Sequence, residues 1–183
     1  YINYNCDYNP EKYDEEKLKV ALEYLTKIIT IEPNNYNALC KLGYIYALEI
    51  SWQNVNKSKE YYLKAHKIEP NNSIALFGLS KINKILKNYN EAIILAKKAY
   101  NLKTEVFYES VISTCYEEFA EYITSQKKYQ DAIDIYESEL KWYDEYFHNA
   151  EINRSYWSNR ENQNEINEKI GDIYYYYLNN EDK

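Results

Sequence analysis

The stretch "SIALFGLSKINKILKNYNEAIILAKKAYNLKTEV", residues 73–106, contains two amphipathic segments separated by "KNYN". Apolar residues at helical spacing predict one helix over about residues 73–87 and a second over about residues 90–103. Small side chains recur along both segments, at Ser80, Ala92, Ala96 and Ala99. Two helices can approach closely only where side chains are small, so we expect these residues to mark the contact line of a helical hairpin.

The pentapeptide "IEPNN" occurs at residues 31–35 and again at residues 68–72, directly before this hairpin. Proline cannot continue a helix because it lacks the backbone N–H. An Asn side chain can cap the first turn of the helix that follows. We therefore expect each copy to join the end of one hairpin to the start of the next, with its second Asn as the cap.

The hairpin resembles the tetratricopeptide repeat (TPR), a pair of helices with a period of about 34 residues. Its matches to the family pattern are Leu76, Leu79, Ser80, Ala92 and Ala99. It departs from the pattern at Asn83, Ala96 and Thr104, where the family has a Tyr, an aromatic residue and a Pro. The family places a small residue where its helices pack most tightly, and Gly43 and Gly171 fall on that position of their units.

The resemblance implies an all-α, right-handed superhelical solenoid of about four units with incomplete ends. We expect a single domain whose units span about residues 14–35, 36–72, 73–106 and 107–150, with a partial unit at 162–178. The first unit lacks a regular first helix, and a loop is expected over residues 148–163. The chain starts without Met or an apolar signal core, so we expect a segment of a longer protein.

Composition narrows the classes of partner. The 183 residues include 45% hydrophobic residues and carry a net charge of −7, which disfavours nucleic acid because nucleic-acid-binding domains show basic faces. No run of about 18 apolar residues is present, so no membrane insertion is expected.

The high content of Asn, Lys, Ile and Tyr is typical of an AT-rich genome. Three widely spaced cysteines predict buried thiols in a reducing compartment, the cytoplasm or the nucleus.

Motifs of catalysis are missing from the sequence. It contains no Gly-rich phosphate loop, HExxH, CxxC or GxSxG, and its two histidines, His66 and His148, are isolated. We therefore expect no enzyme, no cofactor and no metal site.

In TPR arrays, the first helix of each unit lines a concave groove, and the resemblance places twelve residues of this chain there. The groove would be apolar with some lysines at one end and acidic at the other; the alternative interpretation is a set of solvated helix faces. The residues are Tyr44, Leu48, Phe77, Lys81, Lys84, Ile85, Glu117, Glu118, Glu121, Glu165, Glu168 and Asp172.

These residues predict a protein-interaction scaffold or adaptor within a larger complex, with a partner segment that is basic at one end and apolar at the other. The alternative is a regulatory TPR domain attached to an enzyme or a co-chaperone module outside this segment. The clamp that binds chaperone tails in other TPR proteins is not matched here, because Lys41, Ile74 and Gly78 occupy its positions. The sequence leaves open the alternative that such a clamp lies upstream of this segment.

The run "YYYYL" at residues 174–178 places aromatic rings around a whole helix. Such a helix cannot be solvated on every side without exposing a large apolar patch. We expect it to be covered by a following helix, a partner or a second copy of the chain, so terminal helices could support a homo-oligomer.

Overall fold

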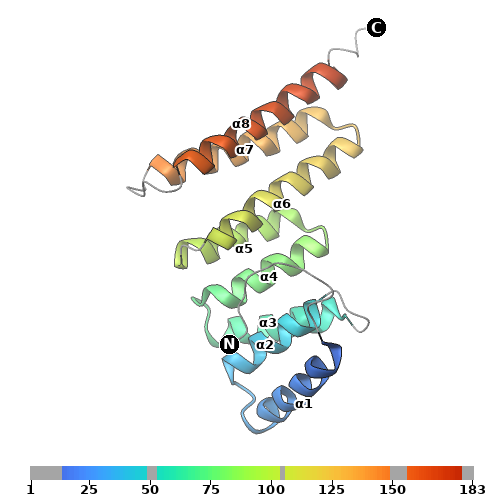
Figure 1. Ribbon diagram of the computed structural model, residues 1–183, viewed down its shortest axis with the longest axis vertical. Coiled ribbons are helices and arrows are strands. Elements are labelled where there is room, and N and C mark those ends of the chain that lie inside the picture. The colour runs from blue at the N-terminus through green and yellow to red at the C-terminus, as the bar shows by residue number, and fades with distance from the viewer. Residues whose placement is uncertain (1–13, 49–52, 104–105, 149–155, 179–183) are drawn as a thin grey trace. The chain divides into compact units, whose positions relative to one another are not determined.

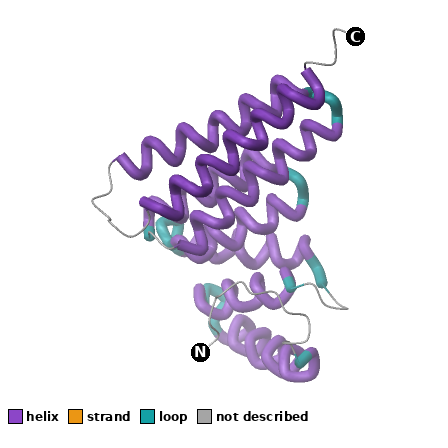
Figure 2. The backbone as a smooth tube through the Cα atoms, turned by 45° about the horizontal axis from the view of Figure 1, so that its top comes forward, coloured by secondary structure: helices purple, strands orange, loops and turns teal. Residues whose placement is uncertain are grey.

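The computed structural model describes residues 14–48, 53–103, 106–148 and 156–178, and in this part of the chain all regular structure is helical (Figures 1 and 2). The all-α fold class is therefore confirmed, while the hand of the superhelix stays a prediction. The helices are α1 (Glu15–Ile31), α2 (Tyr36–Ala47), α3 (Val55–Ile68), α4 (Ser73–Ile85), α5 (Tyr89–Leu102), α6 (Val106–Ser125), α7 (Tyr129–His148), α8 (Tyr156–Ile173) and the π-helical turn η2 (Tyr174–Leu178).

Both copies of "IEPNN" join helices in the same way. The side chain of Asn35 accepts a hydrogen bond from the N–H of Ala38 at 3.0 Å and donates one to the Glu32 carboxylate at 2.8 Å. In the second copy, Asn72 caps α4 and donates to the Glu69 carboxylate, also at 2.8 Å. The predicted caps are confirmed. In each pentapeptide the Glu carboxylate also accepts a hydrogen bond from the capping Asn and so orients its amide group.

The turns inside two hairpins also share one geometry. After α4, Lys87 has a φ of 59°, and the N–H of Asn88 bonds to the carbonyl of Asn83 at 2.8 Å. After α6, Lys127 has a φ of 60°, and the next N–H bonds back across five residues in the same way. This pattern is the Schellman motif, which usually places Gly at the left-handed residue. Its recurrence shows that α4–α5 and α6–α7 are built as equivalent hairpins.

The chain divides into two compact units, unit 1 (Tyr1–Ile112) and unit 2 (Ser113–Lys183), with the boundary inside α6. In unit 1, each of the helices α1 to α5 packs against the next, and α2 also reaches α4. In unit 2, α7 packs against α8, and η2 continues α8 (Figure 1).

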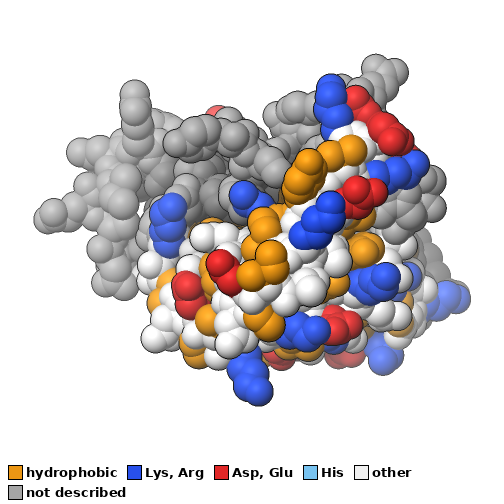
Figure 3. Space-filling model, turned by 90° about the horizontal axis from the view of Figure 1, so that it is seen from below, with side chains coloured by type: hydrophobic (Ala, Val, Ile, Leu, Met, Phe, Trp, Pro, Cys, Tyr) orange, Lys and Arg blue, Asp and Glu red, His pale blue; other side chains and the backbone are white. Residues whose placement is uncertain are grey.

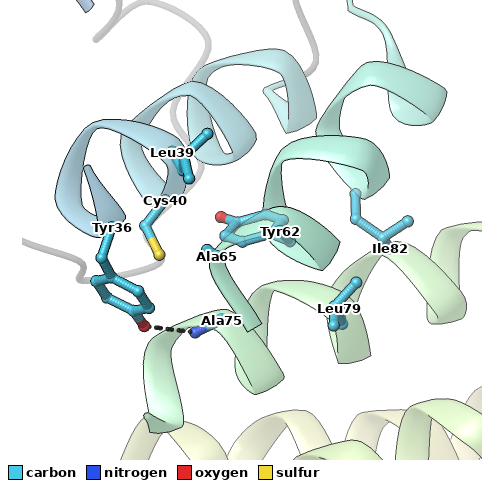
Figure 4. Packing of buried hydrophobic residues seen from close by; sticks show 8 residues of the cluster. All are labelled: Tyr36, Leu39, Cys40, Tyr62, Ala65, Ala75, Leu79 and Ile82. Atoms are coloured by element: carbon cyan, nitrogen blue, oxygen red, sulfur yellow. Dashed lines mark hydrogen bonds between the residues drawn. The ribbon is translucent and has the colours of Figure 1, made fainter. Parts of the chain in front are cut away.

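The core of unit 1 centres on Tyr62, whose side chain from α3 lies among buried residues of α2 and α4 (Figure 4). Only 5% of Tyr62 is exposed. A Cβ atom built on Gly43 of α2 would lie 2.9 Å from the Tyr62 ring, and one built on Gly78 of α4 would lie 2.3 Å from it. The ring therefore needs glycine on both neighbouring helices.

Two serines fasten the hairpins at their points of closest approach. The Ser58 hydroxyl donates to the carbonyl of Gly43 at 2.6 Å, which ties α3 to α2. The Ser80 hydroxyl donates to the carbonyl of Ala92 at 2.8 Å, which ties α4 to α5. Ala92, like Ala96 and Ala99, is fully buried. The predicted contact line of small residues is thus confirmed.

Two expectations about the C-terminal part were wrong. Residues 156–163 were expected in a loop, but α8 begins at Tyr156, because the apolar pattern there is weak and did not reveal a helix. Gly171 was expected at a tight contact, yet nothing lies within 4 Å of the position its Cβ would take. A glycine at the right repeat position therefore does not imply a close neighbour.

We predict that Gly78→Ala lowers the free energy of unfolding by about 1–3 kcal/mol, because the new methyl group overlaps the Tyr62 ring. Gly171→Ala is the matched control, since its methyl group meets open space and gains up to about 1 kcal/mol of helix propensity. Urea unfolding followed by circular dichroism measures both changes. Equal effects of the two substitutions would contradict the packing described.

Ala92→Leu tests the contact line between α4 and α5 separately. Ala92 has no exposed surface, so a larger side chain must displace neighbours, and overpacking of this kind costs about 1–3 kcal/mol. We expect a lower melting temperature than that of the unsubstituted chain. An unchanged melting temperature would show that the helices are not held at this residue.

Candidate functional site

Two of the four apolar residues at the apolar end of the predicted groove belong to the core of unit 1. Leu48 and Phe77 are each only 8% exposed. The Phe77 ring packs against the ring of Tyr108, with 4.7 Å between their centroids, and the ammonium of Lys81 lies 5.7 Å from the Phe77 centroid. These side chains therefore stabilise the chain itself and leave little surface for a partner.

Ile85 is the large apolar residue of this predicted end that faces solvent, with 43% of its surface exposed. Tyr44 and Lys84 are half-buried. The sequence reasoning missed a groove of about 680 Å³ elsewhere in unit 1, which both copies of "IEPNN" help to line. Its lining residues are Ile29, Pro33, Asn34, Leu39, Lys64, Lys67 and Ile68.

Unit 1 also shows an apolar stripe on the outer side of α1. Four of its residues are strongly exposed, from 39% for Ile28 to 80% for Ile31, with Val20 and Tyr24 between these values. Figure 3, which views the structure from the α1 side, shows hydrophobic side chains gathered there beside lysines and acidic residues. The first repeat, about residues 14–35, was expected to lack a regular first helix. That helix is the element that would pack on such a stripe.

The acidic end of the predicted site lies in unit 2, where two of its helices are bridged by one lysine. Lys169 of α8 forms an ion pair with Glu117 of α6 and another with Glu165, one turn away on α8, at 3.2 Å. Partial burial lowers the pKa of Lys169, but the hydrogen bond and charge of Glu117 outweigh this effect and raise it. The two predicted acidic faces are therefore brought together in the structure.

Four more carboxylates of the predicted site lie on these two helices. Glu118 is half-buried on α6, while Glu121, Glu168 and Asp172 are exposed. Unit 2 contains 16 acidic and 7 basic residues, a net charge of −9, whereas unit 1 contains 13 acidic and 15 basic residues, a net charge of +2. The negative charge of the chain is thus concentrated in the unit that holds this acidic face.

A buried carboxyl group lies behind the acidic face. Glu139 of α7 is only 1% exposed and accepts a hydrogen bond from the Ser113 hydroxyl of α6 at 2.6 Å. Burial raises the pKa of Glu139 to about 7, although the Ser113 bond and the charge of Lys169 act against this rise. Sequence reasoning missed Glu139, because a Glu among polar neighbours on an amphipathic helix carries no sign of burial.

The four tyrosines of η2 are all exposed, with fractions between 43% and 67%. Tyr177 stacks on Tyr129 of α7, with 4.6 Å between the ring centroids, and Tyr175 meets the ring of Tyr176 edge-on at 4.9 Å. The described residues thus leave this turn largely uncovered, and whether a partner or a second copy covers it stays a prediction.

Within the described residues, no three His, Cys, Asp or Glu side chains are grouped so that they could hold a metal ion. Across the same ranges, every helix is too short or too polar to span a bilayer. Cys40 and Cys115 are buried thiols outside any disulfide, as predicted, and burial raises the pKa of Cys40 to about 11, so its thiol stays protonated at neutral pH. Cys6 and the loop residues 149–155 lie outside the described residues.

No protein-family model and no curated protein matches this sequence. Among solved structures, the chain is similar to the crystal structure of MamA, with a TM-score of 0.53 and 19% identity over 92% of this chain and 89% of that one. A second crystal structure of the MamA protein gives a TM-score of 0.50 and 19% identity, over 90% and 85% of the chains. The likeness concerns the fold, a TPR-type helical repeat.

We predict that Glu139→Gln stabilises the chain at neutral and alkaline pH. Because the pKa of Glu139 is raised from 4.5 to about 7 on folding, its protonated form fits the fold. The Glu139 side chain therefore stabilises the folded chain fully below about pH 4.5, and this contribution is lost as the pH rises through about 7. The Gln side chain stays neutral and can still accept the Ser113 bond.

Urea unfolding should therefore show a gain of about 1–3 kcal/mol for Glu139→Gln at about pH 8 and almost none at about pH 4.5. Glu137→Gln removes the same charge from the exposed side of α7 and should change little at either pH. A gain for Glu139→Gln that is independent of pH would show that Glu139 does not titrate on folding as described.

Proposed function

We propose that this chain is a protein-interaction module, a scaffold or adaptor, that binds a basic segment of a partner protein on the acidic face of unit 2. This acidic face is formed by six carboxylates and one lysine of α6 and α8. Its residues are Glu117, Glu118, Glu121, Glu165, Glu168, Asp172 and Lys169.

The bridge through Lys169 is the observation that carries the proposal. Like charges three or four residues apart disfavour a helix by only a few tenths of a kcal/mol per pair, so one acidic helix face signals little. Here, the ion pairs of Lys169 with Glu117 and Glu165 place two such faces side by side. Their potentials add, and one lysine offsets only a small part of six negative charges.

The sign of the charge selects the class of partner. A net charge of −9 on unit 2 repels nucleic-acid phosphates and anionic lipid headgroups, whereas it attracts Lys- or Arg-rich protein segments. The TPR-type fold supports the same conclusion, because helical repeats create extended surfaces used for binding. Since Leu48 and Phe77 are buried, Ile85 and the partly exposed Tyr44 are the better candidates for apolar contacts in unit 1.

Electrostatic recognition of this kind acts mainly on the rate of association. We predict that Glu118→Lys with Glu121→Lys slows association of the partner by at least about tenfold and changes dissociation much less. Binding of the unsubstituted chain should also weaken as salt rises, because exposed charges are screened beyond about 10 Å at 0.1 M salt. The partner is identified by affinity purification with mass spectrometry, and both rate constants are then measured at low and high salt.

The matched control is Asp134→Lys with Glu137→Lys, which makes the same change of charge at the same spacing on the exposed side of α7. It should reduce association only modestly, through the overall charge. If the two double variants are equally impaired, or if binding does not depend on salt, the acidic face is not the binding surface.

A further inference from the structure

The exposed tyrosines of η2 directly follow the acidic residues of α8 along the chain. We call Tyr174–Tyr177 together with Tyr129 the tyrosine surface. The four η2 side chains are exposed by 45%, 67%, 59% and 43%. At roughly 200 Å² per tyrosine, this amounts to roughly 400 Å² of exposed aromatic side chain. Exposed apolar area of this extent on soluble proteins is often functional.

The tyrosine surface is fixed in place on one side. Tyr177 and Tyr129 stack with an interplanar angle of 14°, which attaches η2 to the first residue of α7. Tyr175 and Tyr176 meet edge-on, at an interplanar angle of 87°, so each ring limits the movement of the other. Pre-ordered aromatic side chains lose little entropy on binding, which makes tyrosine effective at recognition surfaces.

The acidic stripe of α8 runs directly into these tyrosines. Glu168 and Asp172 are four residues apart on α8 and lie on one side of it. Tyr175 and Tyr176 follow Asp172 by three and four residues, in the π-helical turn η2. Asp172 is exposed, as are both tyrosines. An exposed carboxylate and two exposed tyrosine rings therefore follow one another within five residues of the chain.

We propose that the tyrosine surface binds arginine side chains of the basic partner segment, and that it selects arginine over lysine. This inference rests on the proposed function, whose partner it specifies. A guanidinium is planar and weakly hydrated, so it can stack on a tyrosine face while it donates paired hydrogen bonds to a carboxylate. An ammonium is strongly hydrated and has neither property, so acidic residues alone would not separate the two cations.

The cations of unit 2 indicate which tyrosines take the arginine. Lys127 and Lys128 are exposed and directly precede Tyr129, so they oppose a cation near the Tyr129–Tyr177 stack. Tyr175 and Tyr176 are instead preceded on their own helix by Asp172 and Glu168. The arginine therefore binds at Tyr175 and Tyr176, and Tyr177 serves to hold η2 against α7.

The test uses the full chain and two fluorescein-labelled peptides of equal length and charge, one of alternating Arg and Ser and the other of alternating Lys and Ser. Fluorescence anisotropy measures both dissociation constants. We expect the Arg peptide to bind about fivefold more tightly, from one or two exposed cation–π contacts. Tyr175→Leu with Tyr176→Leu, which keeps apolar surface but removes the rings, should bring the two peptides to within about twofold.

Three control proteins separate this role from a loss of folding. Tyr175→Phe with Tyr176→Phe keeps the rings and should preserve the selectivity, which a general defect would not allow. Tyr24→Leu removes a tyrosine of unit 1 that is 64% exposed and should leave both peptides unaffected. Glu168→Gln with Asp172→Asn should weaken both peptides, because it removes charge that attracts either cation.

The outcomes distinguish the two proposals. Equal affinities for the two peptides, with both weakened by Glu118→Lys and Glu121→Lys, would overturn arginine selection and leave the acidic face as the binding site. Failure of both peptides to bind would overturn the proposed function itself. Tighter binding of a proline-rich peptide without Arg would show that the tyrosine surface recognises a different ligand, and would also overturn the inference.

Discussion

The contact that most constrains unit 1 is the tyrosine ring of α3 held between glycines of α2 and α4. A Cβ atom on either Gly43 or Gly78 would overlap the ring of Tyr62, so this one side chain sets how closely three consecutive helices approach. The hydrogen bond from Ser58 to the carbonyl of Gly43 fastens the same place. At the edge of this core, the N–H of Ala75 donates to the Tyr36 hydroxyl, which joins α4 directly to α2 (Figure 4). The packing of α2, α3 and α4 thus depends on the Tyr62 ring, which fits only because Gly43 and Gly78 have no side chain.

The helices and their caps could be predicted because they depend on short sequence motifs and on the spacing of apolar residues along the chain. The second Asn of each "IEPNN" lies at a position where only its own helix start matters, so its capping role could be predicted. Packing between neighbouring helices depends on which side chain of one helix faces a given residue of the other, and a single sequence does not show this. Gly43 and Gly171 therefore looked alike, although one contacts Tyr62 and the other meets open space. Gly78 was placed only at a position of the chaperone clamp, which the sequence does not match, and its contact with Tyr62 was not foreseen.

The candidate site was predictable to a similar degree. The acidic residues of α6 and α8 could be found because charged side chains usually remain at the surface, and their juxtaposition followed from the repeat. Phe77 and Leu48 were expected to meet a ligand, but large apolar side chains at a helix surface are easily absorbed into the core, as both are here. Glu139 could not be found, because its burial arises only when α6 and α7 meet. Unit 1 thus concentrates aromatic packing around glycines, whereas unit 2 carries the charge proposed for recognition.

The most direct test of this account is a double-mutant cycle between Gly78→Ala and Tyr62→Leu, measured by urea unfolding. If the Tyr62 ring is what the alanine methyl group meets, Gly78→Ala should cost much less once the ring is replaced by Leu. We predict a coupling energy of at least about 1 kcal/mol between the two sites. Additive effects, within about 0.5 kcal/mol, would contradict the claim that the ring sets the spacing of the repeat helices.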